Sequence, residues 1–142
     1  MVLASADKKI SQENIAKDVI LDWWGTTQDA IYAYLSRYFE KLNFKPNSKL
    51  EDLSRHLLKG HTIMVNWWDD LDKDDTEDGH YSLVLDFDKK GGKLTLADPS
   101  LGRGIWKINA KEFNKRWYDS LDTRGNKWVS GWMLWVDPKS KI

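Results

Sequence analysis

The chain has 142 residues, with 22 lysines and arginines against 22 aspartates and glutamates, so its formal net charge is zero and no overall field favours nucleic acid or an anionic membrane. Its content of 41% hydrophobic and 31% charged residues is typical of one globular domain over residues 1–142, with no apolar run near the roughly 20 residues that span a bilayer. The sequence contains no cysteine, which excludes disulfides, thiolate metal sites and thiol nucleophiles within it.

The first half of the chain predicts three helices. Apolar residues four apart in QENIAKDVILDWW, after Ser11, indicate the first. Thr26 and Asp29 resemble a capping box that opens the second, AIYAYLSRYFEKL, and KPN ends it. Ser48 is expected to cap the third helix, over residues 49–58.

The second half of the chain changes to the alternation of strands. HTIMVNWW reads as a strand, and Tyr81 to Asp88 with Lys93 to Asp98 as a hairpin that turns across residues 89–92. GIWKIN is another strand, a helix capped by Asn109 runs through Trp117, and GWMLWV is the last strand. Helices followed by a mainly antiparallel sheet predict an α+β fold.

A histidine and an aspartate on this hairpin form the first candidate site. A turn near Lys90 pairs residues whose numbers sum to about 180, which places Asp98 diagonally across from His80, at about 7–8 Å between backbones. A carboxylate there can accept the Nδ1 proton of the imidazole and leave Nε2 as a general base. The alternative is a purely structural contact at a sheet edge.

The other histidines and the serines give weaker signals. His56, late in a helix, and His61, before a strand, are expected to be ordinary surface residues. Ser11 and Ser48 resemble helix caps, and Ser82 follows His80 on the same strand face without an oxyanion hole. No GxSxG, HExxH, P-loop or GxGxxG motif occurs.

The run DDLDKDDTEDG, residues 69–79, carries seven carboxylates. Counted from Asp70, an EF-hand loop requires Gly and Glu where this chain has Asp75 and Tyr81, so the run is expected to be a solvated, mobile loop. A metal-dependent hydrolase that uses His80 and this run is a further possibility, although no second histidine is spaced to share the metal. We therefore expect neither a metal nor a cofactor.

Nine tryptophans are an unusually large number for this length. Most of them are expected to pack in the core. The alternative is an aromatic groove for a peptide or a sugar, with Trp67 and Trp106 as its binding residues.

The segment GHYSLVLDFD…LADPSLGRGIWKINAKEFNKRW resembles the C-terminal half of the bacteriocin-processing, double-glycine peptidases, cysteine peptidase family thirty-nine and its relatives. The shared features are the GHY histidine, a strand, DP after a second strand, G-R, and a short helix ending in F…W. LLKGHTIMVNWW and ISQENIAKDV also resemble that family, so the likeness spans most of the chain. The resemblance implies a papain-like fold, with His80 as the catalytic base and Asp98 as its orienting acid.

The chain departs from that family at the nucleophile. The family's cysteine, in a CGP-type turn, and a glutamine of its oxyanion hole would both fall before Met1, because MVL resembles the middle of the nucleophile helix. Either the chain is part of a longer active enzyme, or it is a short protein that keeps the scaffold and lacks the chemistry. A short protein would need a repacked N-terminus, a partner or self-association to cover apolar surface.

Two functions follow. The first is a peptidase-like domain for peptide or amide bonds that is inactive as written; the second is a binding module for a peptide, glycan or protein. No signal peptide is visible at MVLASADKK, whereas the family's relatives are often exported, so the compartment stays undetermined.

Overall fold

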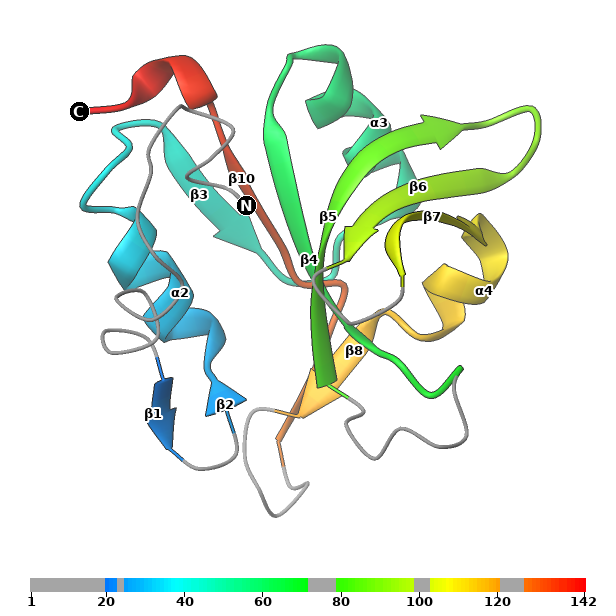
Figure 1. Ribbon diagram of the computed structural model, residues 1–142, viewed down its shortest axis with the longest axis horizontal. Coiled ribbons are helices and arrows are strands. Elements are labelled where there is room, and N and C mark those ends of the chain that lie inside the picture. Colours follow the sequence, from blue (N-terminus) through cyan, green and yellow to red (C-terminus); the bar gives the residue numbers. More distant parts are fainter. Residues whose placement is uncertain (1–19, 23–24, 72–78, 99–102, 121–126) are drawn as a thin grey trace.

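The computed structural model describes residues 20–22, 25–71, 79–98, 103–120 and 127–142 (Figure 1). The helices are α2 (Gln28–Leu35), α3 (Leu50–Leu58), α4 (Ala110–Lys115) and the 3-10 helix η2 (Pro138–Ser140). The strands are β1 (Ile20–Asp22), β2 (Gly25–Thr26), β3 (Leu42–Lys45), β4 (Thr62–Trp68), β5 (Gly79–Asp88), β6 (Lys93–Asp98), β7 (Gly104–Asn109), β8 (Tyr118–Ser120), β9 (Trp128–Ser130) and β10 (Met133–Val136).

Within the described residues, six strands form the main sheet, in the order β3-β10-β4-β5-β6-β7, which Figure 1 shows from left to right. Every neighbouring pair is antiparallel. β1 with β2 and β8 with β9 form two smaller antiparallel sheets. The predicted α+β fold with a mainly antiparallel sheet is therefore confirmed.

The two faces of the main sheet carry different cores. Along β4, Ile63, Val65 and Trp67 pack in a core with Leu53 of α3 and Phe113 of α4. The intervening side chains of β4 point to the opposite face, where α2 supplies Tyr34 and Leu35 to a second core. The alternation of HTIMVNWW thus follows burial on both faces of the sheet, with helices covering each one.

The second helix is shorter than its sequence pattern predicts. The Thr27 hydroxyl accepts a hydrogen bond from the Ala30 N–H at 3.1 Å, so Thr27 and not Thr26 is the N-cap. The helix ends at Leu35, and Phe39 is buried beyond it, in an isolated bridge to Lys141. Tertiary pairing with the C-terminus replaces the last helical turns, which local periodicity cannot reveal.

The caps of the third and fourth helices differ in how well they were predicted. The Asp52 carboxylate accepts from the Lys49 N–H at 2.8 Å, whereas the Ser48 hydroxyl donates to the backbone of Lys45, so the prediction of Ser48 as the cap was wrong. Asn109 accepts from two N–H groups of α4, as predicted. That helix ends at Lys115, before the buried Trp117.

The strands predicted from β4 to β7 and the last strand are all present, within two residues of their expected ends. Five short strands among the described residues were not predicted: β1, β2, β3, β8 and β9. Ile20–Asp22 pairs with β2 as a strand, so the end of the first predicted helix was assigned wrongly, and residues 1–19 of that region lie outside the described residues. Two- to four-residue strands carry too few alternations to be recognised without their partners.

Candidate functional site

The pairing of β5 with β6 brings His80 next to Asp98. Leu83 lies opposite Ala97, so the next position opposite Asp98 is Ser82, and His80 lies two residues farther along the same face. The His80 Nε2 atom is 2.6 Å from Asp98 Oδ1. The diagonal register expected from the hairpin is thus present, and the ring and the carboxylate are in contact.

The nitrogen that makes this contact is not the one expected. The sequence argument assigned Nδ1 to Asp98, whereas Nε2 makes the bond. When Nε2 carries a proton and donates it to Asp98, Nδ1 is the nitrogen with the basic lone pair. The Asp98 side chain is fully buried and that of His80 is mostly buried.

Asp98 also accepts hydrogen bonds on its second oxygen. The indole Nε1 of Trp106 lies 3.2 Å from Asp98 Oδ2, and Nη1 of Arg103 lies 3.4 Å from the same atom. Both donors come from the segment that leads into and along β7. The carboxylate is therefore held by donors at both oxygens.

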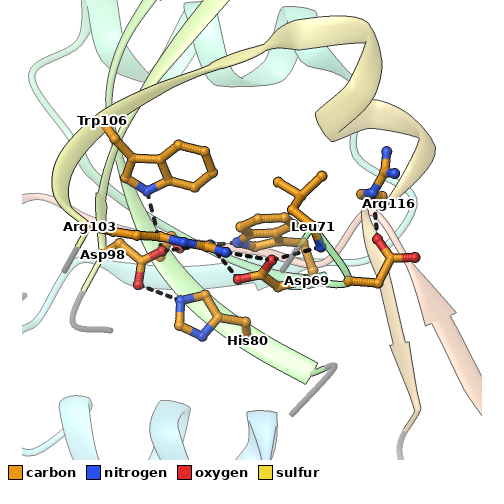
Figure 2. Close-up of polar contacts among 10 residues, drawn as sticks. Asp69, Leu71, His80, Asp98, Arg103, Trp106 and Arg116 are labelled. Atoms are coloured by element: carbon orange, nitrogen blue, oxygen red, sulfur yellow. Dashed lines mark hydrogen bonds and ion pairs between the residues drawn. The ribbon is translucent and has the colours of Figure 1, made fainter. Parts of the chain in front are cut away.

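A second buried aspartate completes the cluster. Arg103 Nη2 donates to Asp69 Oδ1 at 3.1 Å, and its Nη1 donates to Asp69 Oδ2 in a shorter contact. Figure 2 shows the guanidinium between the two carboxylates, with Trp106 on one side and His80 on the other. The centre of the guanidinium lies 4.7 Å from the middle of the Trp106 ring, so Arg103 is also held by a cation–π contact.

The burial of this cluster corrects the prediction for the acidic run. Asp69 is 3% exposed and paired, not solvated, while Asp70 is exposed. Desolvation lowers the pKa of Arg103, but the hydrogen bond and charge of Asp69, with Asp98, outweigh it and raise that pKa above its ordinary value. Residues 72–78 of the run lie outside the described residues. Asp69 and Arg103 were both missed by the sequence argument.

The beginning of β5 is fixed by side chains from the opposite face. Asn66 donates to the His80 carbonyl at 3.0 Å and to the Asp119 carboxylate at 2.8 Å, and it accepts from Gln28. A Cβ atom at Gly79 would lie 2.6 Å from Asp119 Oδ2, so glycine allows this close approach. The backbone that carries His80 is thereby anchored.

The two candidate binding tryptophans have different environments. Trp67 is 0% exposed, donates to Ser82 at 3.0 Å and meets the His80 ring edge-on, so it cannot line an open groove as predicted. Its position on the core face of a central strand is the reason. Trp106 is half-buried beside the cluster.

Fewer than half of the described tryptophans are fully buried in the core. Trp67, Trp117 and Trp132 are buried, and Trp128 is exposed. The others are half-buried. Of these, Trp106 and Trp135 pack against the first core while keeping part of their surface exposed. Trp23 and Trp24 lie outside the described residues.

Three ligand-type atoms of Asp69, His80 and Asp98 lie within 4.8 Å of one another, a spacing that suits a metal ion. Arg103, however, contacts both carboxylates. The oxygen and nitrogen atoms of these three side chains thus suit a positively charged group, and the Arg103 guanidinium already occupies that role beside the two carboxylates.

The remaining histidines form a pair at the other end of the sheet. The Nδ1 atoms of His56 and His61 are 2.9 Å apart, and the His56 ring packs against the Trp135 ring at a tilt of 33°, with 4.3 Å between ring centres. Both rings are half-buried, which corrects the expectation of ordinary surface residues. Burial, followed by the charges of His61 and nearby basic side chains, lowers the pKa of His56 to about 4.

The chain resembles known peptidase domains. A family model described as "Peptidase_C39 like family" matches residues 1–123. Among solved structures, the chain is similar to the crystal structure of the peptidase domain of Streptococcus ComA, a bi-functional ABC transporter involved in a quorum sensing pathway. The two are 12% identical with a TM-score of 0.65, and the match covers 95% of this chain and 84% of that one. At this identity the likeness shows the fold, which confirms the papain-like class; a comparison with curated proteins gives no match.

Proposed function

Because the chain belongs to the Peptidase_C39 like family, we propose that residues 1–142 form one peptidase-like domain that retains a His80–Asp98 dyad and does not itself hydrolyse peptide bonds. The observation that carries this proposal is the 2.6 Å contact between His80 Nε2 and Asp98 Oδ1, on a fold shared with a peptidase domain. The proposal that the chain does not hydrolyse peptide bonds rests on the absence of cysteine from its 142 residues.

The dyad supplies one half of the chemistry of a cysteine peptidase. In such a site an imidazole takes the thiol proton, the thiolate attacks the carbonyl carbon, and the protonated imidazole then gives its proton to the leaving amine. In this chain Asp98 orients the ring through Nε2, so Nδ1 is the atom that would exchange the proton. Without a thiol the covalent step is lost.

The proposal is tested with the pure chain and a panel of peptide and amide substrates. The expected result is no hydrolysis above buffer, with no difference between the native chain and His80→Ala. His61→Ala is the matched control, since it removes a histidine distant from the dyad. Hydrolysis that His80→Ala abolishes and His61→Ala retains would contradict the proposal.

A second candidate is a non-catalytic binding module for a peptide, glycan or protein. It is favoured by Trp106, an aromatic side chain that is half-buried beside the dyad. Titration with synthetic peptides and oligosaccharides, followed by tryptophan fluorescence, is expected to show binding that Trp106→Ala removes and Trp128→Ala retains. Equal loss in both variants, or no response at all, would reject it.

No helix among the described residues has the length and apolar character needed to cross a membrane.

A further inference from the structure

We propose that Arg103 is a positioning residue for the His80–Asp98 dyad: its guanidinium links Asp98 to Asp69 and thereby holds the Asp98 carboxylate in the orientation that accepts the His80 Nε2 proton. The dyad's role rests on the proposed function, but the positioning itself is a matter of geometry. Arg103 touches neither ring nitrogen of His80 in any described contact, so it acts through Asp98.

The contacts of Asp98 divide between its two oxygens. Oδ1 faces His80 at 2.6 Å, while Oδ2 faces Trp106 at 3.2 Å and Arg103 at 3.4 Å. Turning the plane of the carboxylate about its last bond would move both oxygens out of line with these donors. The two donors at Oδ2 therefore determine where Oδ1 points.

Asp69 holds the guanidinium in turn. Both of its oxygens are engaged by Arg103, the two-point geometry that a planar guanidinium makes with a carboxylate. The Trp106 ring packs against the same guanidinium at 4.7 Å. Since Asp69 follows β4 and Arg103 precedes β7, this link ties two distant segments to Asp98 at the end of β6.

The same atoms could be taken for a metal site. Asp69, His80 and Asp98 are close enough to share an ion. An ion would have to displace a guanidinium that contacts both carboxylates, whereas Arg103 supplies a positive charge without any ligand. The two interpretations differ in how the His80 ring responds to added metal.

The tautomer of His80 reports the orientation of Asp98. In the full chain with ¹⁵N-labelled histidine, long-range ¹H–¹⁵N spectra show which ring nitrogen of neutral His80 carries the proton, and Nε2–H is expected to dominate. Arg103→Met is expected to lower the ratio of Nε2–H to Nδ1–H by about tenfold, through loss of a fixed charge-assisted bond. A merely structural arginine would leave this ratio unchanged.

The matched control is Arg116→Met, which breaks a separate cluster in which Arg116 contacts Asp70 and Glu112 and not the dyad. It is expected to leave the His80 ratio at its native value. If Arg103→Met does not fold, Asp69→Asn is used instead, because it removes the charge that anchors Arg103 with little change in volume. This variant is expected to lower the ratio of Nε2–H to Nδ1–H by about threefold. A native ratio in a folded Arg103→Met or Asp69→Asn chain overturns the proposal.

Addition of equimolar Zn²⁺ to the native chain separates the two interpretations. The His80 ring signals are expected to stay unchanged. A shift of those signals that Asp69→Asn abolishes would mean that the cluster is a metal site with a displaceable arginine, which also overturns the proposal. Neither result depends on hydrolysis, so failure of this inference is distinguishable from failure of the proposed function.

Discussion

Two adjacent aspartates, Asp69 and Asp70, follow β4, and each pairs with an arginine from the C-terminal half of the chain. The Asp69 side chain is buried where it contacts Arg103. The Asp70 side chain is 49% exposed and lies 2.7 Å from Arg116, which also contacts the exposed Glu112. The pairs have the same chemistry but opposite environments.

This difference in burial indicates which ion pairs contribute to the stability of the molecule. Water and ions screen an exposed pair, so losing it changes little. A buried carboxylate that loses its partner keeps its desolvation cost without the compensating attraction. Four substitutions test this contrast between buried and exposed groups. They are given from the largest expected effect to the smallest.

The largest effect is expected for Arg103→Met, which removes the guanidinium charge that contacts two buried carboxylates. We expect the free energy of unfolding to fall by about 3 kcal/mol, the lower end for buried pairs, because part of the guanidinium is exposed. Urea denaturation followed by tryptophan fluorescence measures the change. A loss no greater than that of Arg116→Met would show that burial does not separate the clusters.

A neutral buried pair separates the effect of burial from that of charge. Ser82→Ala removes the acceptor of the Trp67 Nε1–H, 3.0 Å away, and leaves a buried donor unsatisfied. The expected cost is about 1–3 kcal/mol by the same denaturation measurement. Ser36→Ala, which removes an exposed hydroxyl bonded to a helix carbonyl, is the control and is expected to change stability little. Equal effects would contradict the role of burial.

Lowering the pH introduces a positive charge on the half-buried ring of His56. Its pKa is lowered to about 4 in the folded chain, from 6.5 as the ordinary value. The unfolded chain therefore binds more protons between these values, so stability is complete above pH 6.5 and falls as the pH drops toward 4.

We expect His56→Asn to reduce the loss of stability between pH 7 and pH 5 by about 1 kcal/mol, well below the full shift, because solvent screens a half-buried ring. Urea titrations of both chains at the two pH values measure it. An identical pH dependence in the variant would show that His56 contributes nothing.

The smallest effect is expected for Arg116→Met. The hydrogen bond from Arg116, followed by the charge of Lys115, lowers the pKa of Glu112, so the variant is expected to raise that pKa toward its ordinary value. NMR titration of the Glu112 carboxyl measures this shift, and added salt is expected to reduce it. Stability should stay close to that of the native chain, and a large loss would contradict the contrast.

The sequence by itself determined the strands around the candidate site. Alternation defined β4 to β7, and the short turn before Lys93 joined β5 and β6 as a hairpin. Both signals are local, because side-chain period and turn length depend on neighbouring residues. The N-cap of α4 at Asn109 was predicted for the same reason. The structure adds a bulge between Val84 and Asp86, which shifts the pairing by one residue and brings Asp98 to the face of His80.

Only the tertiary structure decided the environment of those residues. The pattern at Trp67 is the same for a groove and for a core; the helices that cover its face bury it. Nothing near Asp69 in the sequence indicates Arg103, which lies 34 positions away, and its neighbour Asp70 has the same local sequence but is exposed. Burial and long-range pairing arise from how the elements pack, and no local period encodes that packing.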